Sequence, residues 1–228
     1  MQTTDFRSSY PIRNIKKIEM KLVIFGATGM VGTHLVKQAL FNGHSVRAFG
    51  RNVFTAGLPD NKQLELVQGA LFDAGQVEKA IRGCDAVLSV LGGGIDGNDK
   101  TRSLGMKNIV AQMEKTGVRR IIGIGGLGVL NAAEGQLLLD TPDYPEAYKA
   151  VGEEHRKAWE YLQQSKLEWT FVCPPDIHNE DATGSFHVAA DYPPAENKYH
   201  IRAGDLALFM LAELQQNRFV GKRVGISN

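Results

Sequence analysis

The sequence has little cysteine, no excess of charge of one sign and no long apolar run. Its two cysteines, Cys84 and Cys173, lack the CxxC spacing of a metal or redox site, so we expect reduced core residues of an intracellular protein. The net charge is +1, with acids and bases interspersed, which excludes a basic surface for nucleic acid or an anionic membrane. No run reaches the ~18 apolar residues of a membrane span. These features predict a cytoplasmic protein with no nucleic-acid and no membrane partner.

Other absences concern chemistry. His178, His187 and His200 lack metal-ligand spacing, so we predict no metal site. No Gly-x-Ser-x-Gly sequence is present, so a hydrolase would have no nucleophile. Residues 1–19 are polar and lack the apolar block of a signal peptide, and we expect a flexible N-terminal extension.

The most informative segment is a glycine turn between an apolar strand, Leu22–Phe25, and an amphipathic stretch, Met30–Leu40. Gly26 can adopt backbone angles closed to other residues. Gly29 has no side chain to block a phosphate, and Gly32 lets the helix pack close to the strand. The helix start then offers free N–H groups and a positive dipole end to an anion. A glycine pattern in this context predicts a bound dinucleotide.

Strands and helices alternate along the rest of the chain. Because the interior strands are mostly apolar throughout, we expect a parallel sheet covered on both faces. We therefore predict an α/β fold, a single doubly wound Rossmann domain over residues 20–228, with a small C-terminal substrate lobe at 176–203. Ligands of such sheets bind at the carboxyl edge. Strands are expected near 45–50, 64–68, 85–91, 119–124, 168–173, 185–189, 199–201 and 222–226, and helices near 76–82, 104–115, 146–164 and 205–214.

The end of the second strand lacks the acid that binds the ribose in NAD sites. It is followed by Arg51 and Asn52, and no acid occurs before Asp60. Arg51 would donate to a 2′-phosphate, assisted by Asn52 and the Thr28 hydroxyl, and such a charge-assisted hydrogen bond contributes on the order of 1.5–3 kcal/mol. We predict NADP as the cofactor, with NAD as the alternative. A solvated loop arginine is the other interpretation of Arg51.

These motifs together resemble the atypical short-chain dehydrogenase/reductase family. The similarity is greatest to its small members, biliverdin-IXβ reductase/flavin reductase and NmrA-like NAD(P)-binding proteins, and covers nearly everything from Met20 onward. The run Ala182–Phe186 also resembles the substrate-side segment of the flavin reductases. The motifs that carry the resemblance are GATGMVG at 26–32, Arg51, Gly83–Val87, Ser165–Thr170 leading to Pro174 and Pro175, and Ile201–Ala207.

The resemblance implies a cofactor site along the carboxyl edge of the sheet. The nicotinamide ribose would lie over Leu91, Gly92 and Gly93, and the carboxamide against Pro174 and Pro175. A purely structural role as a strand terminator is the other interpretation of these prolines. Ala70 follows Gly69 where the family has Gly-Asp, so adenine would rest on Leu71 and backbone groups. The full predicted set is Gly26, Thr28, Gly29, Met30, Val31, Arg51, Asn52, Ala70, Leu71, Leu91, Gly92, Gly93, Gly125, Gly126, Pro174 and Pro175.

The largest departures from the family are catalytic. Its reductases commonly use a serine after the fifth strand and a Tyr-x-x-x-Lys pair on the next helix. Gly126 stands at the serine position, Val151 at the tyrosine and His155 at the lysine, and Tyr144 and Tyr148 do not restore the spacing. Ordinary alcohol dehydrogenation by that triad is not expected. The flavin/biliverdin type also lacks the tyrosine, because a conjugated acceptor stacked on nicotinamide takes the hydride directly.

Two functions follow from these residues. The first is an NADPH-dependent reductase of a small flavin-, quinone- or tetrapyrrole-like acceptor, with His155 as ribose ligand or proton donor. A solvated helix histidine is the other interpretation of His155. The second function is a non-catalytic NADP(H)-binding sensor or regulatory protein of the NmrA-like type, which Gly126 and Val151 favour. A nucleotide-sugar epimerase is weaker, since it needs the missing tyrosine. We expect a monomer or a weak homo-oligomer.

Overall fold

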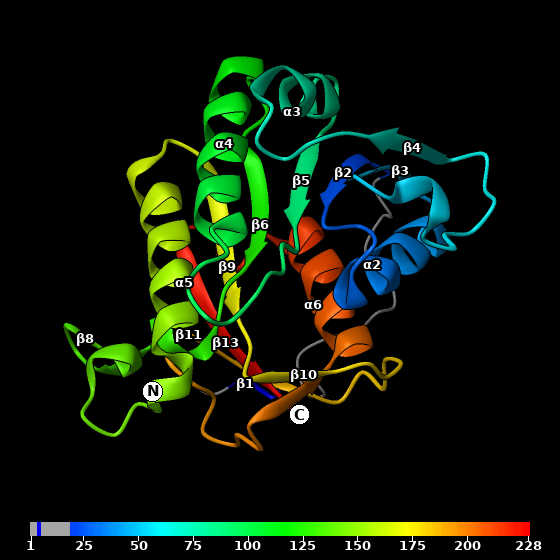
Figure 1. Ribbon diagram of the computed structural model, residues 1–228. Helices are drawn as coiled ribbons and strands as arrows, with labels where there is room; N and C mark the ends of the chain where they lie inside the picture. Colours follow the sequence, from blue (N-terminus) through cyan, green and yellow to red (C-terminus); the bar gives the residue numbers. More distant parts are fainter. Residues whose placement is uncertain (1–3, 6–18) are drawn as a thin grey trace.

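The computed structural model describes residues 4–5 and 19–228, and a nine-stranded sheet runs through it (Figure 1). The strand order is β1-β11-β13-β9-β6-β5-β2-β3-β4. The strands from β13 to β4 are parallel, and β11 and β1 extend one edge in antiparallel pairing. This topology confirms the predicted doubly wound α/β fold. The strand bounds are β1 Thr4–Asp5, β2 Lys21–Phe25, β3 Ser45–Gly50, β4 Leu64–Gln68, β5 Ala86–Ser89, β6 Arg120–Ile124, β9 Glu168–Cys173, β11 His187–Ala190 and β13 Lys222–Ser227.

Helices cover both faces of the sheet. Figure 1 shows α3, α4 and α5 on one side and α2 and α6 on the other. Because side chains alternate along a strand, neighbouring residues of β2 enter different cores. Ile24 packs with the α2 and α6 side, whereas Phe25 packs with the α3, α4 and α5 side. The helix bounds are α2 Met30–Phe41, α3 Ala74–Ile81, α4 Thr101–Thr116, α5 Glu146–Gln164 and α6 Ala203–Gln216.

Local signals place the ends of two helices where the sequence predicts them. The Asp73 carboxylate accepts a 2.9 Å hydrogen bond from the backbone N–H of Gln76, which caps α3. Gly117 ends α4 in the left-handed conformation, with φ of 76°. The hairpin of β7 (Asn131–Ala133) and β8 (Gln136–Leu137) was not predicted, because these short strands have no apolar alternation.

The predicted C-terminal lobe, 176–203, contributes to two sheets. β11 joins the main sheet, whereas β10 (Asp176–His178) pairs with β12 (His200–Arg202) in a separate two-stranded sheet. The predicted extension, 1–19, lies outside the described residues apart from β1 and Glu19. Among the described residues, no helix has the length and apolar character needed to span a membrane, and the cytoplasmic location stays a prediction.

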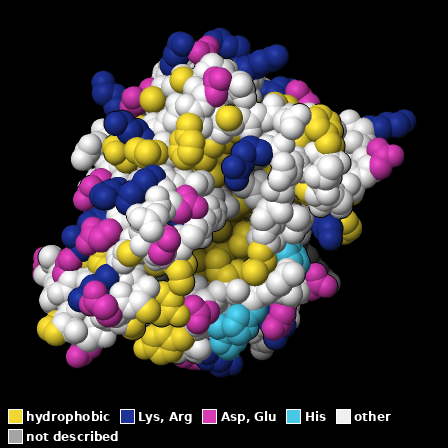
Figure 2. Space-filling model, in the orientation of Figure 1, with side chains coloured by type: hydrophobic (Ala, Val, Ile, Leu, Met, Phe, Trp, Pro, Cys, Tyr) yellow, Lys and Arg dark blue, Asp and Glu magenta, His cyan; other side chains and the backbone are white. Residues whose placement is uncertain are grey.

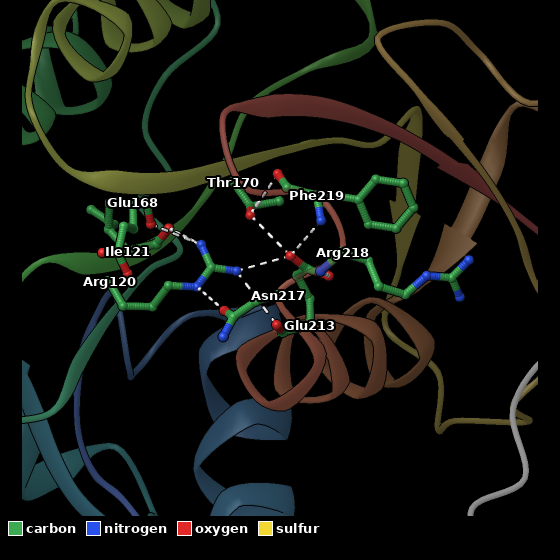
Figure 3. Close-up of polar contacts among 8 residues, drawn as sticks. All are labelled: Arg120, Ile121, Glu168, Thr170, Glu213, Asn217, Arg218 and Phe219. Carbon is green, nitrogen blue, oxygen red and sulfur yellow. Dashed lines mark hydrogen bonds and ion pairs between the residues drawn. The ribbon is translucent and has the colours of Figure 1, made fainter.

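A buried ion pair joins the sheet to α6. Nη2 of Arg120, at the start of β6, donates to Oε1 of Glu213 over 2.9 Å (Figure 3). The Thr170 hydroxyl and the backbone N–H of Phe219 donate to the same oxygen, and Arg120 also donates to Asn217. Burial lowers the pKa of Arg120. The network lies toward the amino ends of β6 and β9, away from the carboxyl edge.

Candidate functional site

The glycine turn between β2 and α2 is shaped by close backbone contacts. Gly26 has a φ of 84°, and a Cβ there would lie 2.4 Å from the carbonyl oxygen of Val90. A Cβ on Gly32 would lie 2.1 Å from the carbonyl oxygen of Gly26, whereas at Gly29 the nearest atom would be 3.4 Å away. No side chain caps α2, and its first turn carries no acid. Gly26 and Gly32 therefore fix the packing, and Gly29 leaves the helix start open to a phosphate.

Arg51 follows β3 with its side chain exposed. Within the described residues its guanidinium has no hydrogen-bond or ion-pair partner; only its backbone oxygen is used, by the Gln68 amide at 2.8 Å. Thr28 lies beside this strand end, since a Cβ on Gly50 would come within 3.6 Å of the Thr28 methyl group. Arg51 thus offers a cation, unpaired among the described residues, just after the strand end that Thr28 borders, as the 2′-phosphate prediction requires.

At the predicted adenine side, Ala70 stands where the resemblance would place an aspartate. The backbone N–H of Ala70 donates to the Gln76 side chain over 2.8 Å. Leu71 packs against α4, where a Cβ on Gly105 would lie 2.5 Å from its Cδ2. An apolar side chain and backbone groups therefore form this surface.

A cleft of about 1080 Å³ opens at the carboxyl ends of β2, β5, β6 and β9. Figure 2 shows a hollow with a hydrophobic floor on this face of the molecule. The cleft brings together the predicted residues Gly29, Met30, Val31, Leu91, Gly92, Gly125, Gly126, Pro174, Pro175 and His155. The predicted residues Gly26, Thr28, Arg51, Asn52, Ala70, Leu71 and Gly93 do not line it.

One face of α5 forms a wall of the cleft. Tyr148, Val151, Gly152 and His155 recur at helical spacing, and all line the cavity. Val151 therefore faces the cleft where a catalytic tyrosine would stand. The helix therefore has the expected register, and the Tyr-x-x-x-Lys pair is missing because other residues occupy its positions.

The His155 ring lies against Gly126. A Cβ on Gly126 would lie 2.8 Å from Cδ2 of His155. Nδ1 of this histidine is buried and has no hydrogen-bond partner among the described residues. Burial, and then the positive charge of Arg102, lower the pKa of His155 to about 3. The ring is thus neutral near pH ~7, able to form hydrogen bonds but not to act as an imidazolium acid in the open cleft.

Tyr144 is a cleft residue that its spacing did not reveal. A Cβ on Gly128 would lie 2.5 Å from its hydroxyl oxygen, and one on Gly152 would lie 3.3 Å away. Burial raises the pKa of Tyr144, so its phenol stays protonated near pH ~7 and can donate. Tyr144 precedes α5, so helical spacing does not reveal it, whereas Tyr148 and His155 lie seven residues apart on one face of that helix.

Hydrogen bonds hold the loop between β5 and α4, both within the loop and to α5. The Asp99 carboxylate accepts from the backbone N–H groups of Thr101 (2.8 Å) and Gly94 (2.9 Å). Hydrogen bonding from the Thr101 side chain, and then from these backbone groups, lowers the pKa of Asp99 to about 2. Glu154 of α5 accepts from the Ser103 hydroxyl and from Nζ of Lys100 (3.1 Å). Burial raises the pKa of Glu154, but these hydrogen bonds lower it on balance. The loop is therefore held against the cleft.

A family model described as NAD(P)H-binding matches residues 26–217. The chain belongs to this NAD(P)H-binding family. The match starts at Gly26 and contains the whole cleft, so the predicted membership of the atypical short-chain NAD(P)-binding proteins is confirmed. The turn, the open helix start and the cleft fit the nicotinamide dinucleotide that this family binds. The choice between NADP and NAD stays a prediction, as do the roles of the individual site residues.

Known relatives span nearly the whole NAD(P)H-binding chain. The uncharacterised sugar epimerase YhfK of Bacillus subtilis is 27% identical over 203 residues, which covers 86% of this chain and 89% of YhfK. A candidate exported protein from Burkholderia pseudomallei is 32% identical with a TM-score of 0.78, covering 92% of this chain and 100% of that one. A candidate NADH-flavin reductase from Streptococcus pneumoniae is 27% identical with a TM-score of 0.77, covering 92% and 99%.

Proposed function

We propose that the protein is an NADPH-dependent reductase that passes hydride to a flat conjugated acceptor of the flavin, quinone or tetrapyrrole type. The cleft carries this proposal, because it joins the start of α2 to an apolar cavity in a single space of about 1080 Å³. A ligand pocket of roughly 300–1,000 Å³ buries most of a drug-sized molecule. The cavity therefore has room for the nicotinamide half of a cofactor and a stacked acceptor.

Bound NADPH would supply the hydride, and the chain would supply position and hydrogen bonds. Gly29 leaves the diphosphate room at the helix start, and Leu91 lies where the ribose is expected. Gly125 and Pro174 line the cleft at the ends of adjacent strands and would form a wall for the ring. A stacked acceptor then takes hydride at about 3–3.5 Å and a proton from water, because the cleft is open.

Two polar groups are placed to orient these ligands. His155, held neutral, would hydrogen-bond the nicotinamide ribose through the ring edge that lines the cleft, because its Nδ1 is buried. Tyr144, held protonated, would donate to an oxygen or nitrogen of the acceptor. The likeness to a candidate NADH-flavin reductase supports an acceptor of this chemistry.

A non-catalytic NADP(H)-binding sensor is the alternative. Gly126 and Val151 favour it, since both line the cleft where a reductase of this superfamily would carry its serine and tyrosine. A sensor would need the cofactor site and none of the proton-donating groups.

The test follows NADPH absorbance with flavin, dichlorophenolindophenol, a quinone or biliverdin as the acceptor. We expect steady oxidation with at least one of them. Gly29→Val is the matched control: Gly29 has a φ of −81°, so valine fits the backbone, but its side chain blocks the phosphate site. Tight NADPH binding without turnover of any acceptor would overturn the reductase proposal and favour the sensor.

A further inference from the structure

Arg102 is a cation inside a largely apolar cleft. It lies in the first turn of α4 and lines the cavity half-buried. Nη1 donates to the carbonyl oxygen of Gly94 (2.8 Å) and Nη2 to that of Gly93 (3.0 Å). A guanidinium has five N–H donors, so three remain. Within the described part of the chain, none of these three has a partner.

The acids nearest to Arg102 are engaged elsewhere. Asp99 accepts from backbone N–H groups of its own loop, and Glu154 accepts from Ser103 and Lys100. Among the described residues no carboxylate forms an ion pair with Arg102. Burial lowers the pKa of this guanidinium, although the charges of Asp99 and Glu154 partly oppose the effect. A half-buried guanidinium that keeps three unused donors and forms no ion pair among the described residues is suited to bind an anionic group of a ligand.

We infer that Arg102 binds an acidic group of the acceptor, so that the substrate is a conjugated ring system carrying a carboxylate or phosphate. This inference rests on the proposed function. The planar fork of arginine suits such a group, because it donates two parallel hydrogen bonds to two oxygens. Arg102 shares the cleft with the His155 and Tyr148 wall of α5, and its charge acts on His155. The cofactor phosphates already have the helix start and Arg51, which do not involve this wall.

FMN and riboflavin test the inference, because they share one ring system and differ by a phosphate. Each flavin is titrated into protein saturated with NADP+, and quenching of flavin fluorescence gives the dissociation constant without turnover. We expect FMN to bind roughly tenfold or more tightly than riboflavin, as one charge-assisted contact allows. In Arg102→Gln, FMN binding weakens by a similar factor and riboflavin binding stays unchanged. Glutamine keeps a donor for the loop carbonyls.

Lys107→Gln is the matched control. Lys107 lies on the same helix, is exposed and does not line the cleft, so its loss changes net charge equally and leaves both flavins unaffected. If Arg102→Gln weakens the binding of FMN and riboflavin equally, the arginine only orders the loop. If it weakens NADPH binding and leaves FMN binding unchanged, the arginine binds the cofactor. Either result overturns the inference. The inference is also overturned if the protein binds FMN no more tightly than riboflavin, or binds neither flavin. Failure of the proposed function is a separate result, seen as no oxidation of NADPH.

Discussion

At the scale of single residues, we predict that Arg51 decides between NADPH and NADH. Its guanidinium is unpaired among the described residues, so removing it leaves no buried partner without a charge. We expect Arg51→Ala to weaken NADPH binding roughly tenfold to a hundredfold and NADH binding little. Fluorescence titration of each dinucleotide measures this. Arg119→Ala, an exposed change at the opposite edge of the sheet, is the control. Equal losses for both cofactors would contradict the prediction.

His155 makes stability depend on pH. The folded protein keeps this histidine neutral down to pH about 3, whereas the ordinary value is 6.5. Between these values the unfolded chain binds the extra proton, so stability falls as the pH falls. Relative to His155→Gln, the natural chain should lose up to about 2 kcal/mol between pH ~6.5 and ~5.

Urea unfolding at several pH values measures this difference. Asp99 has a pKa lowered from 3.8 to about 2, so its contribution is lost only below this range of pH. The same pH slope in both proteins would show that His155 takes up its proton as easily in the folded state.

The sequence spacing predicts which α5 residues face the cleft, but it does not predict their protonation states. Val151 and His155 face the cleft because positions four apart share a helix face, which the sequence shows directly. The neutral imidazole depends on the Gly126 backbone and on the charge of Arg102, both distant in the chain. Burial of this kind is set by tertiary packing.

At the scale of elements, the Arg120–Glu213 pair fastens α6 to the sheet. Removing only one partner leaves a buried charge, which typically costs about 3–5 kcal/mol. We expect Arg120→Met to destabilise the protein by that amount and Arg120→Met with Glu213→Gln to recover much of it. Glutamine retains an oxygen that can accept from Thr170 and Phe219. Denaturant unfolding of the three proteins checks this, and equal stability of the single and double variants would contradict it.

The elements themselves were predictable where burial is strong. Apolar strands and long amphipathic helices, such as β6 and α5, lie where the sequence placed them, within a residue or two. The β7–β8 hairpin and the pairing of β10 with β12 were missed, because strands of two or three residues carry too few positions for a pattern. Apolar alternation also does not show that β11 would join the main sheet.

At the scale of the whole molecule, cofactor binding should raise thermal stability. A ligand at 100 times its dissociation constant adds about 2.7 kcal/mol to the stability of the folded state. For a domain of this size we expect a rise in Tm of roughly 5–10 °C with saturating NADPH. A thermal melt with and without NADPH measures the shift, and Gly29→Val should abolish it. An unchanged Tm in the natural chain would contradict NADPH binding at this site.

The contact between Gly126 and His155 also fixes an order for redesign. A serine at position 126 would push its Cβ into the imidazole, since the two would be 2.8 Å apart. Conversion toward an alcohol dehydrogenase must therefore replace His155 by lysine before Gly126 is replaced by serine. The reverse order passes through an overpacked intermediate, so the effects of changes at these two positions on stability should not add.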